Sequence, residues 1–456
     1  MIMFKKPIVS LLSVIALATG AQQALAKVSA EEAARLGQDL TPVGAEKAGN
    51  ADGTIPAWTG GGVGEIPAGY VPGGHHPDPF ADEQPLYTIT AQNAAEYADQ
   101  LSEGQLALFT TYPDTYKMKV YPSHRTYQAP DWVYERTRAC AEQAELVSDG
   151  NGISGAHACY PFPVPQTGLE VLWNHSLRFN GLYRVDAIDS AAPDAKGRYV
   201  LDKVTRNTYW PYWDLEKEGT DRLSMFIPRQ LAPARVAGDT FLLLDYQDAS
   251  AKPRQAWRYF GGQRRVRRAP IFVFDTPVPP SQGLRTLDTY DMFFGSPEKY
   301  DWKLIGKKEM LVGYNAYGLG AGGIKNDDVI QPGHINPELP RYELHRMWVV
   351  EATLKDGERH IYSRRMLYLD EDSWNVLVHD MYDNKGQLWR TAHRHLKLYW
   401  EAQVMAEANE VHHDLISRRY NVVTMMGENP GPFDYSQPPP GDSFFTPANI
   451  RKMGVR

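Results

Sequence analysis

A long series of strand-like segments constrains the fold of this 456-residue chain more than any other feature. From Leu169 onward, apolar and aromatic residues recur with a period of two, and each run ends at a turn-forming sequence. At least ten strands are expected, at about residues 171–179, 197–209, 222–228, 239–247, 254–260, 266–275, 302–314, 341–355, 359–369, 374–382, 387–401 and 414–425. The pattern predicts a mainly β protein with a few inserted helices.

Short polar segments join the strands of the last third of the chain. Residues 355–358, 370–373 and 383–386 consist of charged residues, Asn, Gly and Ser. Because such short connections link neighbouring antiparallel strands without helical crossovers, we expect an antiparallel meander. One helix, at about 284–294, is expected to interrupt the strands.

Both faces of the predicted strands carry large apolar side chains. In residues 341–354, Trp348 lies on one face and Met347 on the other, and Trp389 belongs to a similarly mixed strand at 386–400. Such strands fit either an ordinary sheet with one covered face or a curved sheet whose concave face encloses an apolar cavity. In the second interpretation, Trp348 and Trp389 are candidate ligand contacts.

The N-terminus has the three parts of a secretory signal peptide. Lys5 and Lys6 supply the positive charge, residues 8–18 are apolar, and residues 24–26 (Ala-Leu-Ala) form a small-x-small cleavage site. The apolar run is shorter than the roughly 18 residues of a membrane span. We therefore expect cleavage after residue 26 and export of the mature chain.

The mature chain is acidic. Removing residues 1–26 leaves 46 basic and 55 acidic residues, a formal charge of −9. An exported chain of this charge is a poor binder of phosphate backbones, so nucleic acid is not an expected partner.

The two cysteines suit an oxidising compartment. Cys140 and Cys159 stand on either side of a turn signal at 149–152, which would bring them together. We predict a disulfide that stabilises the fold by roughly 3 kcal/mol. A nucleophilic cysteine is the alternative interpretation.

The region before the strands is rich in Gly and Pro. Residues 41–86 are expected to form an extended arm or loops, with one helix beginning at a capping box of Ser29 and Glu32 and another at about 91–109. The arm either packs on its own β domain or docks in a partner's groove. The expected divisions are a signal peptide (1–26), N-terminal helices and arm (27–110), one β domain (111–430) and a Pro-rich tail (431–456).

The segment 257–277 places arginines ahead of apolar residues. Gly261 and Gly262 predict a hairpin turn, and the following strand changes from charged to apolar, as in a strand that enters a cavity from its rim. The arginines either pair with acidic neighbours on the surface or bind an anionic head group at the cavity mouth. The candidate ligand contacts in this segment are Trp257, Tyr259, Arg265, Arg267, Phe272 and Phe274.

No familiar catalytic motif is present. The sequence lacks a Gly-x-Ser-x-Gly elbow, a His-Glu-x-x-His helix and a phosphate-binding glycine loop. The best metal candidate is the pair His393 and His395, with His360, His379 and Asp380 on neighbouring strands; zinc needs three or four converging ligands. We predict no catalytic residue, metal or cofactor, and a metal-dependent enzyme of the envelope is the catalytic alternative.

Four sequence blocks, at 36–61, 257–270, 288–317 and 341–374, resemble those of a Gram-negative periplasmic family known as domain of unknown function 1329. The blocks are spread over nearly the whole mature chain. That family is grouped with the outer-membrane lipoprotein-sorting proteins LolA and LolB. The resemblance implies a large unclosed antiparallel β-barrel wrapped around a few helices, with a hydrophobic ligand inside. It also implies a periplasmic location and association with resistance-nodulation-division type permeases and outer-membrane proteins.

The residues and the resemblance together predict a periplasmic carrier or binding protein for a lipid or other hydrophobic molecule, working with envelope transport machinery. The alternative from a different class is a non-catalytic scaffold that docks on an outer-membrane or permease partner through the arm.

Overall fold

The computed structural model describes residues 28–71, 73–269, 274–278, 281–431 and 433–455, so the expected signal peptide lies outside the described residues. Short helices and strands make up the first part of the chain. They are α1 (Ala30–Ala34), β1 (Tyr87–Ile89), η1 (Ala94–Gln100), α2 (Glu103–Thr111), β2 (Met118–Val120), α3 (Asp131–Cys140), β3 (Glu145–Val147), η2 (Ser148–Gly150), β4 (Gly152–Ser154) and α4 (Gly168–Ser176). The capping box predicted at Ser29 and Glu32 is present at the start of α1.

Strands dominate the rest of the chain. The first group is β5 (Tyr183–Ala191), β6 (Asp202–Tyr209), η3 (Pro211–Trp213), η4 (Leu215–Lys217), β7 (Arg222–Ala232), β8 (Thr240–Tyr246), β9 (Gln255–Phe260) and β10 (Arg265–Arg268). The second group is η6 (Leu287–Thr289), β11 (Tyr300–Gly313), η7 (Tyr317–Gly320), α5 (Asn326–Val329), β12 (Tyr342–Leu354), β13 (Arg364–Asp370), β14 (Val376–Tyr382), β15 (Leu388–Tyr399), β16 (Val404–Asp414), β17 (Arg419–Met425), η8 (Asp442–Phe444) and α6 (Pro447–Val455).

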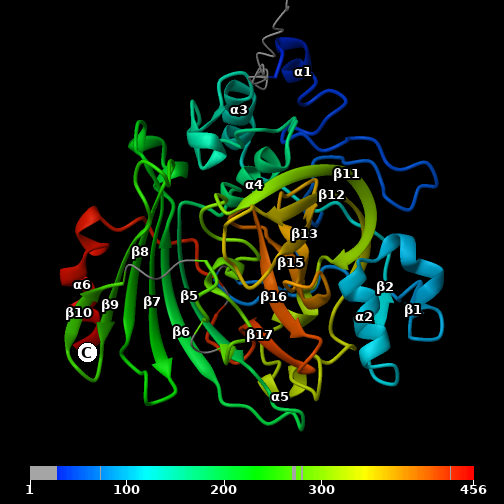
Figure 1. Ribbon diagram of the computed structural model, residues 1–456. Helices are drawn as coiled ribbons and strands as arrows, with labels where there is room; N and C mark the ends of the chain where they lie inside the picture. Colours follow the sequence, from blue (N-terminus) through cyan, green and yellow to red (C-terminus); the bar gives the residue numbers. More distant parts are fainter. Residues whose placement is uncertain (1–27, 72, 270–273, 279–280, 432, 456) are drawn as a thin grey trace, which may run out of the picture.

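One 15-stranded sheet contains all of these strands except β3 and β4 (Figure 1). Its order is β1-β2-β12-β13-β14-β15-β16-β17-β5-β6-β7-β8-β9-β10, and β11 also pairs with β12. The neighbours are antiparallel except at the single parallel pairing of β2 with β12. Among the described residues no pairing joins β1 to β10, so the mainly β, mostly antiparallel unclosed sheet predicted from the sequence is confirmed.

The predicted C-terminal meander is also confirmed. Strands β11 to β17 pair in chain order, each antiparallel to the next. A register shift between Leu304 and Gly306 interrupts the long β11, which bends around the second half of the sheet in Figure 1. Such an irregularity increases local twist, which allows a 14-residue strand to follow a curved sheet.

Helix α4 occupies the residues where the first strand was predicted, so the strand at 171–179 is wrong. The Thr167 side chain accepts a hydrogen bond from the Glu170 backbone and forms a capping box that begins a helix. A Cβ on Gly168 would lie 2.9 Å from the backbone carbonyl carbon of Lys303. Glycine therefore lets the helix begin directly against β11.

The other predicted helices are also revised. The helix expected at 91–109 is divided into η1 and α2 by Ser102, which caps α2. The helix expected at 284–294 is wrong, because only the 3-10 turn η6 forms there. Asp291 and Met292 have φ values of 54° and 65°, in the left-handed region that ends a right-handed helix.

The short strands β1 to β4 were not predicted, and neither were the longer strands β5 and β16. Asp186, Asp189, Glu407 and Glu410 interrupt their apolar pattern, yet all four are buried. Buried acids of this kind need positively charged partners, and most of those partners come from other segments of the chain. The period of two therefore fails wherever a strand points a charge inward.

The half of the sheet from β6 to β9 has two apolar faces. Its outer face, with Leu242 and Tyr259, packs against Ile450 of α6, so the expected Pro-rich tail contains a helix that covers the sheet (Figure 1). Its inner face carries Phe226, Phe241, Leu243 and Ala256, which pack with Tyr290 and Phe294. The alternation that predicts these strands thus supplies apolar side chains to both sides.

The arm packs on its own β domain rather than projecting from it. Val43, Ile55 and His76 are buried, and the Trp58 indole donates a hydrogen bond to the backbone carbonyl of Tyr127. Within the described residues, no helix combines the length and apolar character needed to cross a membrane.

Candidate ligand-binding cavity

Two adjoining cavities lie on the inner face of the sheet. The larger has a volume of about 280 Å³ and the smaller about 150 Å³. Strands β5 to β8 form one wall, strands β16 and β17 contribute to the other, and a covering segment, residues 274–278 and 281–298, lies across them. The residues that line both cavities are Arg206, Phe226, Arg254, Arg285, Tyr290, Phe294 and Val423. The seven shared residues place the two cavities directly beside each other.

The alternation of β6, β7 and β8 explains the apolar part of the lining. Val204, Phe226, Phe241 and Leu243 point inward, while the residues between them face α6. At the other end, Trp210, Trp213 and Phe293 line the larger cavity. Aromatic walls of this kind suit an apolar ligand.

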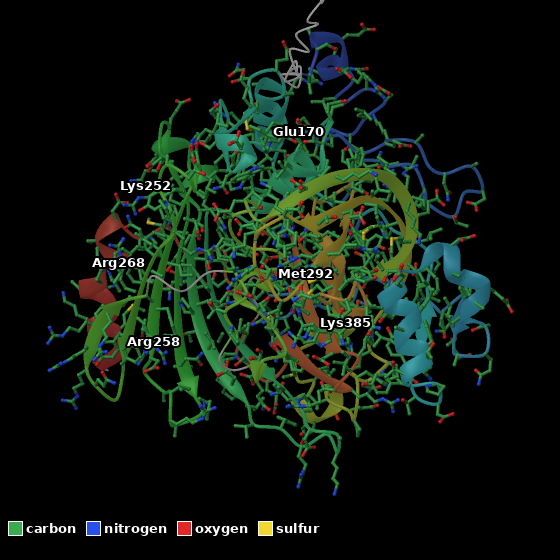
Figure 2. All side chains as sticks on the ribbon, in the orientation of Figure 1. Glu170, Lys252, Arg258, Arg268, Met292 and Lys385 are labelled. Carbon is green, nitrogen blue, oxygen red and sulfur yellow. A yellow bond between two sulfur atoms is a disulfide. The ribbon has the colours of Figure 1, made fainter. Side chains whose placement is uncertain are left out.

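Ion pairs from distant segments hold the covering segment in place. Arg178 and Arg394 each place a guanidinium nitrogen 2.5 Å from the same Asp291 oxygen. Although burial works against the charged carboxylate, the two arginines lower the pKa of Asp291 well below its usual range. Met292, next in sequence, is fully buried, and Figure 2 shows it near the centre of the molecule.

Arginines distinguish this cavity from a purely apolar one. Six arginines and six acidic residues line the larger cavity, and five arginines and two acidic residues line the smaller one. Most of the guanidinium groups are paired: Arg254 Nε lies 2.6 Å from Asp245 Oδ1, and Arg394 Nη2 lies 2.8 Å from Glu410 Oε2. The lining therefore combines an apolar wall with an organised set of buried charges.

The candidate contacts in segment 257–277 lie in different places. Phe274 lines the larger cavity, whereas Phe272 lies outside the described residues. Arg265 and Arg267 are exposed on edge strand β10 and line neither cavity. Arg268 on the same strand also lines neither cavity, and Figure 2 shows it at the outer edge of the sheet. The hairpin turn between β9 and β10 is where the sequence predicts it.

The other four aromatic candidates, Trp257, Tyr259, Trp348 and Trp389, line neither cavity. Trp257 and Tyr259 belong to the outer cluster under α6. Trp348 stacks on Trp374 at 6.2 Å between ring centroids, and the Trp389 indole donates to an Asp414 oxygen at 2.9 Å. Each of these four side chains therefore has a role in the packing of the protein. That they contact a ligand stays a prediction.

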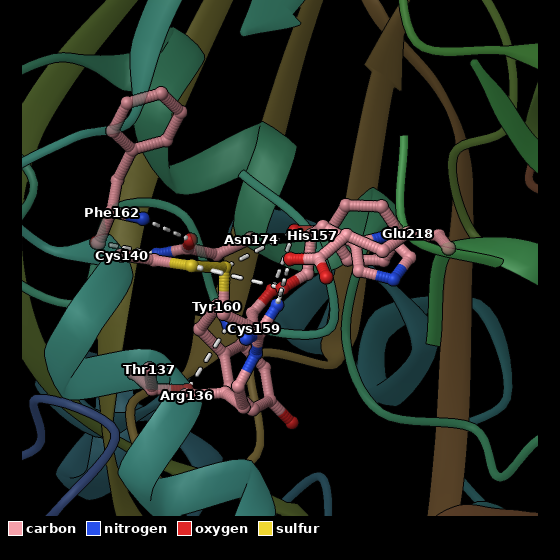
Figure 3. Close-up of a disulfide and its surroundings, with 10 residues drawn as sticks. Arg136, Thr137, Cys140, His157, Cys159, Tyr160, Phe162, Asn174 and Glu218 are labelled. Atoms are coloured by element: carbon pink, nitrogen blue, oxygen red, sulfur yellow. Dashed lines mark hydrogen bonds and ion pairs between the residues drawn. A yellow bond between two sulfur atoms is a disulfide. The ribbon is translucent and has the colours of Figure 1, made fainter. Parts of the chain in front are cut away.

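The predicted disulfide between Cys140 and Cys159 is confirmed (Figure 3). It joins the end of α3 to the loop that precedes α4. That loop is held further by Asn174, whose side chain bonds both backbone groups of Phe162. The bridge therefore braces α4, which supplies Trp173 to the larger cavity.

The predicted histidine pair does not form a metal centre with its proposed neighbours. His393 Nε2 lies 3.1 Å from Thr391 Oγ1, and Asp380 accepts a hydrogen bond from the same hydroxyl at 2.7 Å. His360 instead lies 3.0 Å from Asp288. These side chains form separate hydrogen-bonded groups, without the convergence that zinc requires.

A different buried group, His345, Asp370 and Asp372, brings three possible ligand atoms within 4.8 Å in the described part of the chain. However, Asp372 accepts two hydrogen bonds from Arg125, at 2.8 and 2.7 Å. Because this bidentate pair already uses both oxygens of the carboxylate, the group is explained as a structural ion-pair network.

The sequence did not identify the cavity arginines Arg178, Arg184, Arg206, Arg285 and Arg394. One signal was available: on β15, Arg394 stands between Ala392 and Leu396 on one apolar strand face. A charge at such a position predicts a buried partner. The partner cannot be read from the sequence, because Asp291 lies in an irregular segment more than 100 residues away.

The fold and the cavity define a mainly β protein with an unclosed sheet and an internal, arginine-containing binding space. The chain belongs to the family described as "Protein of unknown function (DUF1329)", whose model matches residues 88–451. The predicted family is thereby confirmed, and three of the four sequence blocks lie within the matched residues. "Uncharacterized protein PA3922" of Pseudomonas aeruginosa is 46% identical over 448 residues, covering 97% of this chain and 98% of the relative.

The solved structures to which this chain is similar share little sequence with it. A DUF1329 family protein from Desulfovibrio piger and a putative outer membrane lipoprotein-sorting protein domain from Vibrio parahaemolyticus are each 13% identical, with a TM-score of 0.43, covering 62% of this chain and 97% of theirs. LolA superfamily protein NE2245 from Nitrosomonas europaea is 14% identical, with a TM-score of 0.37, covering 62% of this chain and 98% of that one.

Proposed function

We propose that this protein binds a lipid or other hydrophobic small molecule in the two adjoining cavities and carries it through the periplasm. The observation that supports the proposal is the unfilled space of about 280 and 150 Å³ against the apolar inner face of β6 to β8. An apolar cavity of about 150 Å³ is large enough to admit benzene. An acyl chain would therefore find space along the two cavities.

The expected affinity suits a carrier. Burying one methylene group contributes about 0.8 kcal/mol, so ten methylenes contribute about 8 kcal/mol before the costs of association are subtracted. That range allows both capture of a hydrophobic molecule from water and its later release.

The cellular setting is part of the same proposal. The expected signal peptide and the Cys140–Cys159 disulfide support an oxidising envelope compartment. The family resemblance supports a permease of the resistance-nodulation-division type or an outer-membrane protein as donor or acceptor. The arm, which packs on its own domain, offers no specific support for the scaffold alternative.

Mass spectrometry of extracted ligand tests the proposal. Mature protein purified without detergent is extracted with organic solvent, and we expect a fatty or sterol-like compound. Val423 is buried and lines both cavities, so Val423→Trp should fill the space and lower the extracted amount by about fivefold or more.

The matched control is Val200→Trp, because Val200 is 66% exposed and lies in the loop between β5 and β6. This variant should release as much ligand as the wild type. The proposal fails if the wild type releases no hydrophobic compound and also takes up no N-phenyl-1-naphthylamine, a neutral fluorescent probe of apolar cavities.

A further inference from the structure

The buried arginines of the cavity are paired in two balanced groups. In the first group, Arg178 and Arg394 neutralise Asp291 and Glu410. In the second, Arg184 and Arg206 face Asp186, with Arg206 Nε 2.5 Å from Asp186 Oδ1, and both lie within 4.0 Å of Glu407. Each group therefore contains two positive and two negative charges.

Arg285 is a further buried cavity arginine, and it belongs to neither of these two charge-balanced groups. Its side chain is 7% exposed and lines both cavities. Among the described residues its guanidinium donates no hydrogen bond, its Nε has no partner, and its ion pair is with Glu410, 3.6 Å from Nη1. An arginine this deeply buried normally has its donors satisfied.

Glu410 has little capacity left for Arg285. One of its oxygens accepts from His412 Nε2 at 2.6 Å, and the other accepts from Arg394 Nη2 at 2.8 Å. Burial accordingly lowers the pKa of Arg285, whereas the pKa values of Arg184 and Arg394 are raised by their acidic neighbours despite burial. Arg285 thus has only a long ion pair to Glu410 and a ring contact with Tyr290, whose centroid lies 5.7 Å from the guanidinium carbon, among the described residues.

Other cavity arginines also have unsatisfied donors, and one of them faces Arg285 from β6. Arg206 also lines both cavities, and its Nη2 has no hydrogen-bond partner. Of the described residues, the acids that line the smaller cavity are Asp202 and Asp239, and Asp239 is paired with Arg258 at 2.6 Å. Burial raises the pKa of Asp202 to about 6, the behaviour of a carboxyl that lacks a close cation.

We propose that Arg285, assisted by Arg206, binds the anionic head group of the ligand, a carboxylate or a phosphate, while the apolar tail lies along Phe226, Phe241 and Leu243. This inference rests on the proposed function and narrows the ligand to an acidic amphiphile. A guanidinium group suits both head groups, because its donors match two oxygens of either one. The site lies inside the cavity, away from the exposed arginines of β10.

Displacement of N-phenyl-1-naphthylamine from the mature protein tests the inference. The competitors are decanoate, decyl phosphate and decanol, which share one chain length and differ in head group. Either decanoate or decyl phosphate should bind at least about tenfold more tightly than decanol, because an ionic hydrogen-bonded contact supplies that difference. The better of the two anions identifies the head group.

Substitution locates the head group. Arg285→Gln should remove the preference for the anion while leaving the affinities for the probe and for decanol within about twofold of the wild type. The matched control is Arg198→Gln, an exposed arginine paired with Asp194 in the loop between β5 and β6, which should keep the preference. The double variant Arg265→Gln/Arg267→Gln tests the site predicted from the sequence.

Each outcome supports or overturns the inference. Retained anion preference in Arg285→Gln overturns it, and loss of preference in the β10 double variant alone moves the head group to the sheet edge. If Arg285→Gln does not fold, Asp202→Asn is used to test the inference instead. Removing this carboxyl should tighten decanoate binding at pH 7.5. An unchanged affinity for decanoate overturns the inference. Absence of probe binding in the wild type overturns the proposed function itself.

Discussion

Arg178 and Arg394 each lie 2.5 Å from the same oxygen of Asp291. Arg178 follows the end of α4, Arg394 is on β15, and Asp291 belongs to the covering segment. Removing a partner from such a buried network costs about 3–5 kcal/mol, because an uncompensated charge remains. At the residue scale, the interior is therefore held by charge pairing as well as by apolar contact. Arg285 is the exception, and that exception marks the proposed head-group site.

Asp202 gives a residue-scale prediction for the dependence of stability on pH. Its folded pKa is about 6, raised by burial, and an exposed aspartate has a pKa of about 3.9. Because the folded state then binds the proton more tightly, the contribution of Asp202 to the free energy of unfolding should fall as pH rises from about 4 to about 6, by up to about 3 kcal/mol. Urea denaturation at pH 4.5, 6 and 7.5 measures this change.

The control for this prediction is Asp202→Asn, which cannot titrate. Its stability relative to the wild type should increase from pH 4.5 to pH 7.5. A difference between the two proteins that stays constant over this range would contradict a raised pKa at Asp202.

Helix α4 shows how local signals compete at the scale of one element. The apolar run that includes Val171, Leu172 and Trp173 fits a strand, but the capping box of Thr167 and Glu170 and the close approach of Gly168 to β11 select a helix. Conversely, the sequence at 284–294 fits a helix, but the ion pairs of Asp288 with Arg365 and of Asp291 with Arg178 hold it in an irregular conformation. The outcome in each case depends on the ends of the segment and on its partners.

The disulfide gives a prediction at the same scale. Replacing Cys140 and Cys159 together by Ser should lower the free energy of unfolding by about 3 kcal/mol, because the 19-residue loop is no longer closed in the unfolded chain. Urea denaturation of the variant and the wild type measures the loss. Reductant should destabilise the wild type by a similar amount and leave the variant unchanged, and a reductant effect on the variant would contradict this explanation.

The whole molecule consists of two well-paired runs of strands joined at a weak seam. Strands β15 and β16 pair at ten positions, whereas β17 and β5 pair at Val422 with Ala191 and at Met425 with Asp189, with a register shift between them. The cavity lies across this seam, since Arg206 of β6 and Val423 of β17 both line it. Ligand binding should therefore tie the two runs together.

Hydrogen exchange tests this expectation. Without ligand, amides of β5 and β17 should exchange faster than those of β15 and β16, because fewer ladder hydrogen bonds protect them. Decanoate at about ten times its dissociation constant should slow exchange at the seam by roughly tenfold. Slowing confined to β13 and β14, which lie outside the cavity, would contradict a ligand that bridges the seam.

The sequence by itself determined the β class, the antiparallel C-terminal meander, the hairpin at Gly261 and the Cys140–Cys159 pair. These features depend on a period of two, on turn residues and on short connections, all of which are local along the chain. Only the tertiary structure decided which face of β6 to β9 meets the cavity, because both faces are apolar and α6 covers one of them. The tertiary structure also decided the pairing of the buried arginines, because each arginine pairs with an acid that only folding brings close to it.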